Sequence, residues 1–287
     1  MRPRTRRRLI TALLRLVAVT IILAFSVGPV LYGLLLSFRP LSTIVNEPLN
    51  LIPKPSEIDW SSYALAMGDE KAGGFGLTRF MVNSFVVSFA TVAAVLLVSI
   101  LGAYAATRLA FRGRSAVNVL FLSIYLFPGI VLAVPLFVMM SRIGLTGTLP
   151  GLVLIYVAQT VPVAIYMLRN YFGAISESIE EAAMVDGCGR MGLIRRIVLP
   201  LALPGIAATA LYIFMIAWNE YLFALLFLVA QRDRWTVALG IARLTEATVP
   251  APVLLAGSIT ITIPVLLAFF LAQKLLVSGL TAGAEKG

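Results

Sequence analysis

Six segments of this sequence are each long and apolar enough to cross a lipid bilayer, which constrains the fold more than any other feature. A helix needs about 20 mostly apolar residues to span the hydrocarbon. Backbone polar groups in lipid must also find partners within the protein, which favours helices. We therefore predict an all-α polytopic membrane protein. Its six transmembrane helices are expected at roughly 13–38, 82–107, 116–140, 149–169, 205–230 and 253–277.

The composition supports a membrane protein and excludes several other classes. Of the 287 residues 60% are hydrophobic and 13% are charged, whereas soluble domains carry about 25% charged residues. The net charge of +10 reflects basic residues on the cytoplasmic side, and we predict no nucleic-acid partner. Histidine is absent and Cys188 is the single cysteine. This excludes an intrachain disulfide, Cys/His metal sites and histidine-based triads.

Basic residues also set the expected orientation. With the N-terminus inside, 15 of the 23 Lys and Arg residues fall on the cytoplasmic side, so both termini are predicted to be cytoplasmic. The opening MRPRTRRR resembles the start of a signal peptide. However, the apolar run continues through Gly28-Pro29 without a small-residue cleavage site, so we expect an uncleaved first span.

The predicted domain organisation follows from these spans. Residues 1–38 form a basic tail and first span, and 39–81 form an external loop. Residues 82–277 form a five-span core that contains a cytoplasmic loop at 170–204, and 278–287 form a cytoplasmic tail.

The cytoplasmic loop contains EEAAMVDGCGRMGLIRRIVLPLALPG, which is predicted to form two short helices. Ser178 and Glu181 have the spacing of a capping box that would begin the first helix. Gly187 is placed to end it in the left-handed conformation. The second helix is predicted at 190–198, with Pro200 and Pro204 ending it. The apolar face of the first helix is expected to consist of Ile175, Ile179, Ala182 and Ala183.

Spacing alone leaves two functions open for this loop. The small Ala182-Ala183 pair would let another protein surface approach closely. Alternatively, the two helices lie in the lipid headgroups, with Arg195 and Arg196 on anionic lipid. Glu181 in turn has the alternative role of the acid in the capping box.

The segment resembles the E-A-A-x3-G-x9-I-x-L-P signature of the permease subunits of ABC importers, and all seven fixed positions match. The resemblance implies the type I importer permease fold. It also implies that the loop is a coupling helix that docks on an ATPase subunit. The coupling residues carried over are Glu181, Ala182, Ala183, Asp186, Gly187, Ile197, Leu199 and Pro200.

The ending LVSGLTAGAEKG, with RNYFGAISESIEEAAMVDG and AWNEYLFAL, resembles the second, six-span subunit of maltose-type transporters in the carbohydrate-uptake branch. Glu285 departs from the usual valine. The implied partners are a second permease subunit, two ATPase copies, an external sugar-binding protein and membrane lipid, in a bacterial inner membrane. No cofactor is expected in this chain. The sequence has no G-x-x-x-x-G-K-[ST] loop, so ATP and Mg would bind to the partner ATPase.

Several polar residues within the spans are candidates for a substrate pathway. Glu220 is an intramembrane carboxylate, which is a functional candidate by default; for Glu220 and Asn219 the alternative is a structural bond to a neighbouring helix. Asn83 has the alternative role of a helix cap, and the others have the alternative of packing. The candidate set is Asn83, Tyr125, Gln159, Asn219, Glu220 and Tyr221.

The resemblance favours a non-enzymatic permease subunit for a sugar or oligosaccharide. The alternatives are an importer permease for a non-sugar solute, such as glycerol phosphate or a polyamine, and a gradient-driven secondary transporter. A secondary transporter would more often show inverted repeats or several buried charges. A membrane enzyme would need an acid, base or nucleophile constellation, and the sequence shows none.

Overall fold

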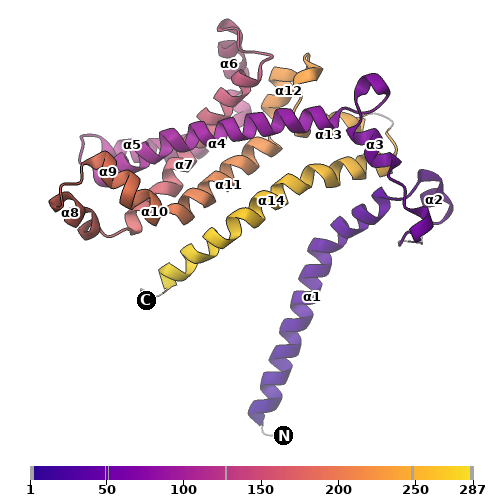
Figure 1. Ribbon diagram of the computed structural model, residues 1–287, viewed down its shortest axis with the longest axis horizontal. Coiled ribbons are helices and arrows are strands. Elements are labelled where there is room, and N and C mark those ends of the chain that lie inside the picture. Colours follow the sequence, from indigo (N-terminus) through magenta and orange to yellow (C-terminus); the bar gives the residue numbers. More distant parts are fainter. Residues whose placement is uncertain (1–2, 49, 51, 127, 247–248, 285–287) are drawn as a thin grey trace. The chain divides into compact units, whose positions relative to one another are not determined.

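The computed structural model describes residues 3–284 except 49, 51, 127, 247 and 248, and every regular element in these ranges is helical (Figure 1). The chain divides into two compact units, Met1–Leu77 with Arg243–Thr262, and Thr78–Ala242 with Ile263–Gly287. The helices α4 (Leu77–Arg108), α13 (Val237–Glu246) and α14 (Ala251–Ala284) continue from one unit into the other.

The first unit is organised around a buried arginine. It contains α1 (Pro3–Ser37), α2 (Leu41–Asn46), η1 (Pro55–Glu57), α3 (Ser61–Met67) and η2 (Glu70–Ala72). Arg39 is 1% exposed and donates hydrogen bonds to the carbonyl oxygens of Thr43, Glu47 and Asn50. The Arg39 side chain thereby supplies donors to carbonyl oxygens at the end of α2.

The second unit is a helix bundle built around α7 (Leu149–Ala174). Among the long apolar helices of the described part, α7 is the most buried. It contacts α5 (Arg114–Leu126), α6 (Gly129–Arg142), α11 (Leu203–Asn219) and α12 (Leu222–Leu228). Val95 of α4, Ala164 of α7 and Ile213 of α11 form one buried cluster. Figure 1 shows α4, α7 and α11 alongside one another, with α8 to α10 at one end.

Small residues let α4 lie close to its neighbours. Its buried positions recur every three or four residues, as expected for one helix face. Serine, threonine and alanine permit close approach of helices in a membrane. The buried residues of α4 are Leu77, Phe80, Ser84, Val87, Ser88, Thr91, Val95, Ser99, Ala103, Tyr104 and Ala106.

Four helical segments of the described chain are long and apolar enough to span a membrane: Ile10–Ser37, Leu77–Arg108, Leu149–Ala174 and Ala251–Leu276. The bent pair Arg190–Leu201 and Leu203–Asn219 raises the number to five. The predicted third span is divided between α5 and α6, and the predicted fifth between α11 and α12. Pro128 is the N-cap residue of α6 and has extended backbone, with φ −62° and ψ 121°.

Candidate coupling surface

The first helix of the loop predicted to be cytoplasmic is α8 (Glu177–Val185), and its end confirms the role predicted for Gly187. Gly187 has φ 81°, a conformation that glycine adopts without a steric penalty. The amide of Gly187 donates to the Met184 carbonyl and that of Cys188 donates to the Ala183 carbonyl. These two bonds form a Schellman motif, so the reversal after Asp186 is closed by hydrogen bonds.

The predicted start of α8 at a Ser178 capping box is wrong. The helix begins at Glu177 with Ser176 at the N-cap position, and Ser176 Oγ lies 2.8 Å from Ser178 Oγ. Glu177 and Glu180 occupy the first turn, where the helix dipole favours negative charge. Glu181 therefore lies beyond the cap and is exposed, which removes the alternative that it closes a capping box.

The outward face of α8 differs from the predicted one. Glu181 and Ala182 are exposed, and Val185 is 89% exposed. Ala183 instead packs against the apolar cluster beneath the loop, and Ile179 is 45% exposed. The expected shared face of Ile175, Ile179, Ala182 and Ala183 is therefore wrong. Ile175 precedes α8 and packs with Ala183 against the cluster, whereas Ile179 and Ala182 are exposed and Glu180 is the buried residue of this helix.

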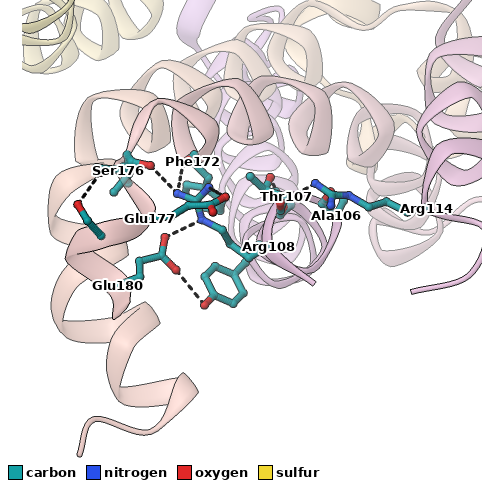
Figure 2. Close-up of polar contacts among 12 residues, drawn as sticks. Ala106, Thr107, Arg108, Arg114, Phe172, Ser176, Glu177 and Glu180 are labelled. Carbon is teal, nitrogen blue, oxygen red and sulfur yellow. Dashed lines mark hydrogen bonds and ion pairs between the residues drawn. The ribbon is translucent and has the colours of Figure 1, made fainter. Parts of the chain in front are cut away.

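Arg108 at the end of α4 anchors the first turn of α8 (Figure 2). Its Nε donates to Glu180 Oε1 at 2.7 Å, and its Nη1 donates to Glu177 Oε1 at 3.3 Å. Its Nη2 donates to the carbonyl oxygens of Phe172 at 2.9 Å and Ile175 at 2.6 Å. One guanidinium thus joins the end of α4, the end of α7 and the start of α8.

Glu180 is held through both of its carboxylate oxygens. Tyr104, one turn before Arg108 on α4, donates from its hydroxyl to Glu180 Oε2 at 3.2 Å. The side chains of Arg108 and Glu180 are only 9% and 6% exposed. Because a buried charge without its partner is unfavourable, removing either residue alone should destabilise the fold by about 3–5 kcal/mol.

The second half of the loop consists of α9 (Arg190–Leu193), a π-helical turn η3 (Ile194–Val198) and α10 (Leu199–Leu201). The prediction that Pro200 ends this helix is wrong, since the helix continues to Leu201. The amide of Leu199 donates to the Ile194 carbonyl five residues back, and this π turn accommodates the N–H that Pro200 cannot supply. The chain then bends by 79° into α11.

The signature residues of this second half face in different directions. Ile197 and Leu199 pack against the same apolar cluster as Ala183, whereas Pro200 is exposed. The cluster consists of Ala103, Tyr104, Ile165, Leu168, Phe172, Leu193, Ile194, Val198 and Ala202.

A polar pocket of about 210 Å³ lies between the end of α4 and α8. Its lining combines the acids of α8 with basic side chains, and Glu181 forms part of it. Within the described residues, no group of three or more Asp, Glu or Cys side chains is arranged to hold a metal ion. The pocket is lined by Tyr104, Arg108, Leu109, Glu177, Glu180, Glu181, Met184 and Arg190.

Glu220 separates α11 from α12 and caps the second helix. Its carboxylate accepts hydrogen bonds from the amides of Phe223 and Ala224. It also accepts one from the Tyr156 hydroxyl at 2.7 Å, the alternative bond to a neighbouring helix that the sequence left open. Because its side chain supplies the acceptor that the start of α12 needs, the fifth predicted span is broken at this residue.

The other predicted pathway residues do not gather at one place. Asn83, at the start of α4, donates to the carbonyl oxygens of Asp233 and Trp235, each at 2.9 Å. Asn219 is exposed and bonds to the Met215 carbonyl within its own helix. Gln159 and Tyr221 are half-buried, and Tyr221 adjoins the break at Glu220. The side chain of Tyr125 lies outside the described residues.

Sequence reasoning missed Tyr104, Arg108 and Glu180. Arg108 was visible only as one of the basic residues that mark a cytoplasmic loop, and Glu180 as an acid off the apolar face. The two lie 72 positions apart, so no local spacing connects them.

The family of the chain is shown by comparison with known proteins. Residues 98–281, which include the whole signature, match the family described as "Binding-protein-dependent transport system inner membrane component". The inner membrane ABC transporter permease protein YcjP of Escherichia coli is 40% identical over 216 residues, covering 74% of this chain and 76% of that protein. The trehalose/maltose transport system permease protein MalG of Thermococcus litoralis is 32% identical over 284 residues, covering 98% and 99%.

Solved structures agree on the fold. A chain of a bacterial ABC transporter involved in import of the polysaccharide alginate superimposes with a TM-score of 0.78 at 23% identity, covering 94% of this chain and 97% of that one. The resemblance to ABC-importer permeases that was drawn from the signature is thus confirmed. The chain belongs to the family of binding-protein-dependent transport system inner membrane components.

Proposed function

We propose that this chain is the permease subunit of an ATP-driven importer that takes up a sugar or oligosaccharide and is coupled to its ATPase through α8. The observation that carries the proposal is the arrangement of the signature. Glu181 and Ala182 are presented on the exposed face of α8, while the Schellman turn and the buried Glu180 hold that helix in place. An exposed helix with a fixed base is suited to docking into a cleft of another subunit.

The partners follow from this role. A second, different permease subunit completes the membrane pathway, and two ATPase copies bind ATP and Mg and carry out hydrolysis. An external binding protein delivers the solute. In this assembly the chain crosses the inner membrane six times with both termini in the cytoplasm, α5–α6 and α11–α12 each forming one broken span. In support, the alginate transporter was solved in complex with a periplasmic protein bound to an alginate pentasaccharide.

The substrate class rests on the relatives. Their names describe transport of trehalose or maltose, trehalose, sulfoquinovosyl glycerol and diacetylchitobiose. All of these carry sugar units, which supports a carbohydrate over glycerol phosphate or a polyamine. Within this chain the part of the pathway that we propose is the break at Glu220 with the adjoining Tyr221, whereas Asn83 is bonded to Asp233 and Trp235.

The test is purification of the chain with co-expressed ATPase, second permease and binding protein, followed by ATPase assays with a panel of sugars. We expect one copy of this chain beside one different permease. Hydrolysis should rise when the binding protein carries one of the sugars. A complex with two copies of this chain, or stimulation by glycerol phosphate or a polyamine and by no sugar, would contradict the proposal.

A further inference from the structure

The contacts of α4 at its two ends carry an inference that rests on the proposed coupling role of α8 and goes beyond it. We propose that α4 is the element that transmits movement of α8 through the permease, and that Tyr104 and Arg108 are positioning residues for this coupling. Movement of α8 would then reach α4 through the hydrogen bonds of Tyr104 and Arg108 to Glu180, and not through apolar packing alone.

At the α8 end of α4, two hydrogen bonds fix the position of the Glu180 carboxylate. Tyr104 and Arg108 are one turn apart on α4 and so share one face. They bind the two oxygens of the same carboxylate, at 3.2 Å and 2.7 Å. A buried carboxylate held in this way has little freedom to slide, unlike an apolar contact. A shift of the first turn of α8 must therefore move the end of α4 or break these bonds.

The same helix is held at its opposite end. Asn83 donates to the carbonyl oxygens of Asp233 and Trp235, and the amide of Val237 donates to Ser84 Oγ at 2.9 Å. The Trp235 ring also packs near that of Phe80, at 5.7 Å between centroids. These contacts attach segment 233–237 to the first turns of α4.

The two hydrogen-bonded sites lie far apart on one rigid helix, α4. Residues 83 and 108 belong to one uninterrupted helix, and at 1.5 Å per residue they are about 38 Å apart along its axis. Chains of hydrogen bonds joined by a rigid element can carry coupling over such distances. We infer that displacement of α8 is felt at segment 233–237 through α4.

The first test compares three variants in the complete complex, reconstituted in liposomes with its binding protein. Arg108→Met leaves Glu180 buried without its partner and is expected to lower stability. The double variant Arg108→Met/Glu180→Leu removes both charges, which restores stability because no buried charge is left unpaired. The control Arg114→Met removes an arginine at the same end of α4, which donates to the carbonyl oxygens of Ala106 and Thr107 rather than to Glu180 (Figure 2).

The readout is solute uptake per ATP hydrolysed, measured with the thermal midpoint and the amount of bound ATPase. The double variant is expected to keep its ATPase and a near-normal midpoint while uptake per ATP falls about tenfold. The control should keep the normal ratio. A purely structural role for the pair predicts that the double variant recovers both stability and uptake, and this result would overturn the proposal.

The second test addresses the far end of α4. Asn83→Ala is expected to give the same fall in uptake per ATP with the ATPase still bound. Normal uptake would show that α4 does not transmit the movement of α8 to segment 233–237. Glu181→Lys, measured in parallel, distinguishes failure of the proposed docking through α8 from failure of the proposed transmission through α4. If Glu181→Lys is inactive but the double variant couples normally, only the inference about α4 fails. If Glu181→Lys transports normally, the proposed docking through α8 fails.

Discussion

Replacing Glu181 by lysine is expected to abolish uptake while the permease still inserts and folds. Glu181 is exposed on the outer face of α8, so the change leaves the buried anchor of Glu180 untouched. At a docked interface, however, the reversed charge would face whatever basic group Glu181 meets. Losing such a pair costs about 2–5 kcal/mol of binding. Uptake into liposomes and co-purification of the ATPase measure the effect.

Two alanine variants separate docking from folding. Ala182→Trp adds bulk on the exposed face and should block docking without changing the thermal midpoint. Ala183→Trp forces the same bulk into the apolar cluster beneath the loop and should lower the midpoint as well. If Ala182→Trp and Glu181→Lys both transported at normal rates with the ATPase bound, α8 would not be the coupling element and a location in the lipid headgroups would explain it better.

A methyl group at Gly205 is expected to disrupt the junction between α10 and α11. A Cβ at this position would lie 2.2 Å from Cγ of the Tyr171 ring. Real Cβ atoms do not approach this closely, so α11 would have to move away from α7. Overpacking of this kind costs about 1–3 kcal/mol. Gly205→Ala should therefore lower the thermal midpoint measured in detergent, and Gly205→Val should lower it further.

The matched control is Gly173→Ala in the last turns of α7. A Cβ there meets nothing within 4 Å, and alanine is favoured over glycine in a helix by about 0.5–1 kcal/mol. This variant should raise the midpoint slightly. If both glycine variants moved it in the same direction and by the same amount, close contact with Tyr171 would not be what requires glycine at position 205.

Features with a local physical cause were predictable from the sequence. Long apolar runs predicted α1, α4, α7 and α14 because each run is sufficient to form its helix. Gly187 was predicted correctly because a helix end with a left-handed residue has its own sequence pattern. The signature correctly predicted the family, which residues 98–281 confirm.

Features that depend on distant partners were not predictable. The start of α8 was misplaced because Arg108, from another helix, engages Glu177 and Glu180 in its first turn. The division of the predicted fifth span depends on Glu220, which caps α12 and bonds to Tyr156, 64 positions away. A hydropathy pattern shows that such an acid is unusual in a span but not which backbone groups it will satisfy.

The most direct measurement of the central claim is a cross-link from α8 in the assembled complex. Cys188 is the only cysteine, so Val185→Cys in a Cys188→Ser background places a single thiol at a position of α8 that is 89% exposed. A photoreactive maleimide attached there should form its adduct with the ATPase subunit. The same probe at Ser123→Cys, exposed on α5, should not. Adducts formed at Val185→Cys with lipid, and none with a bound ATPase, would contradict the account.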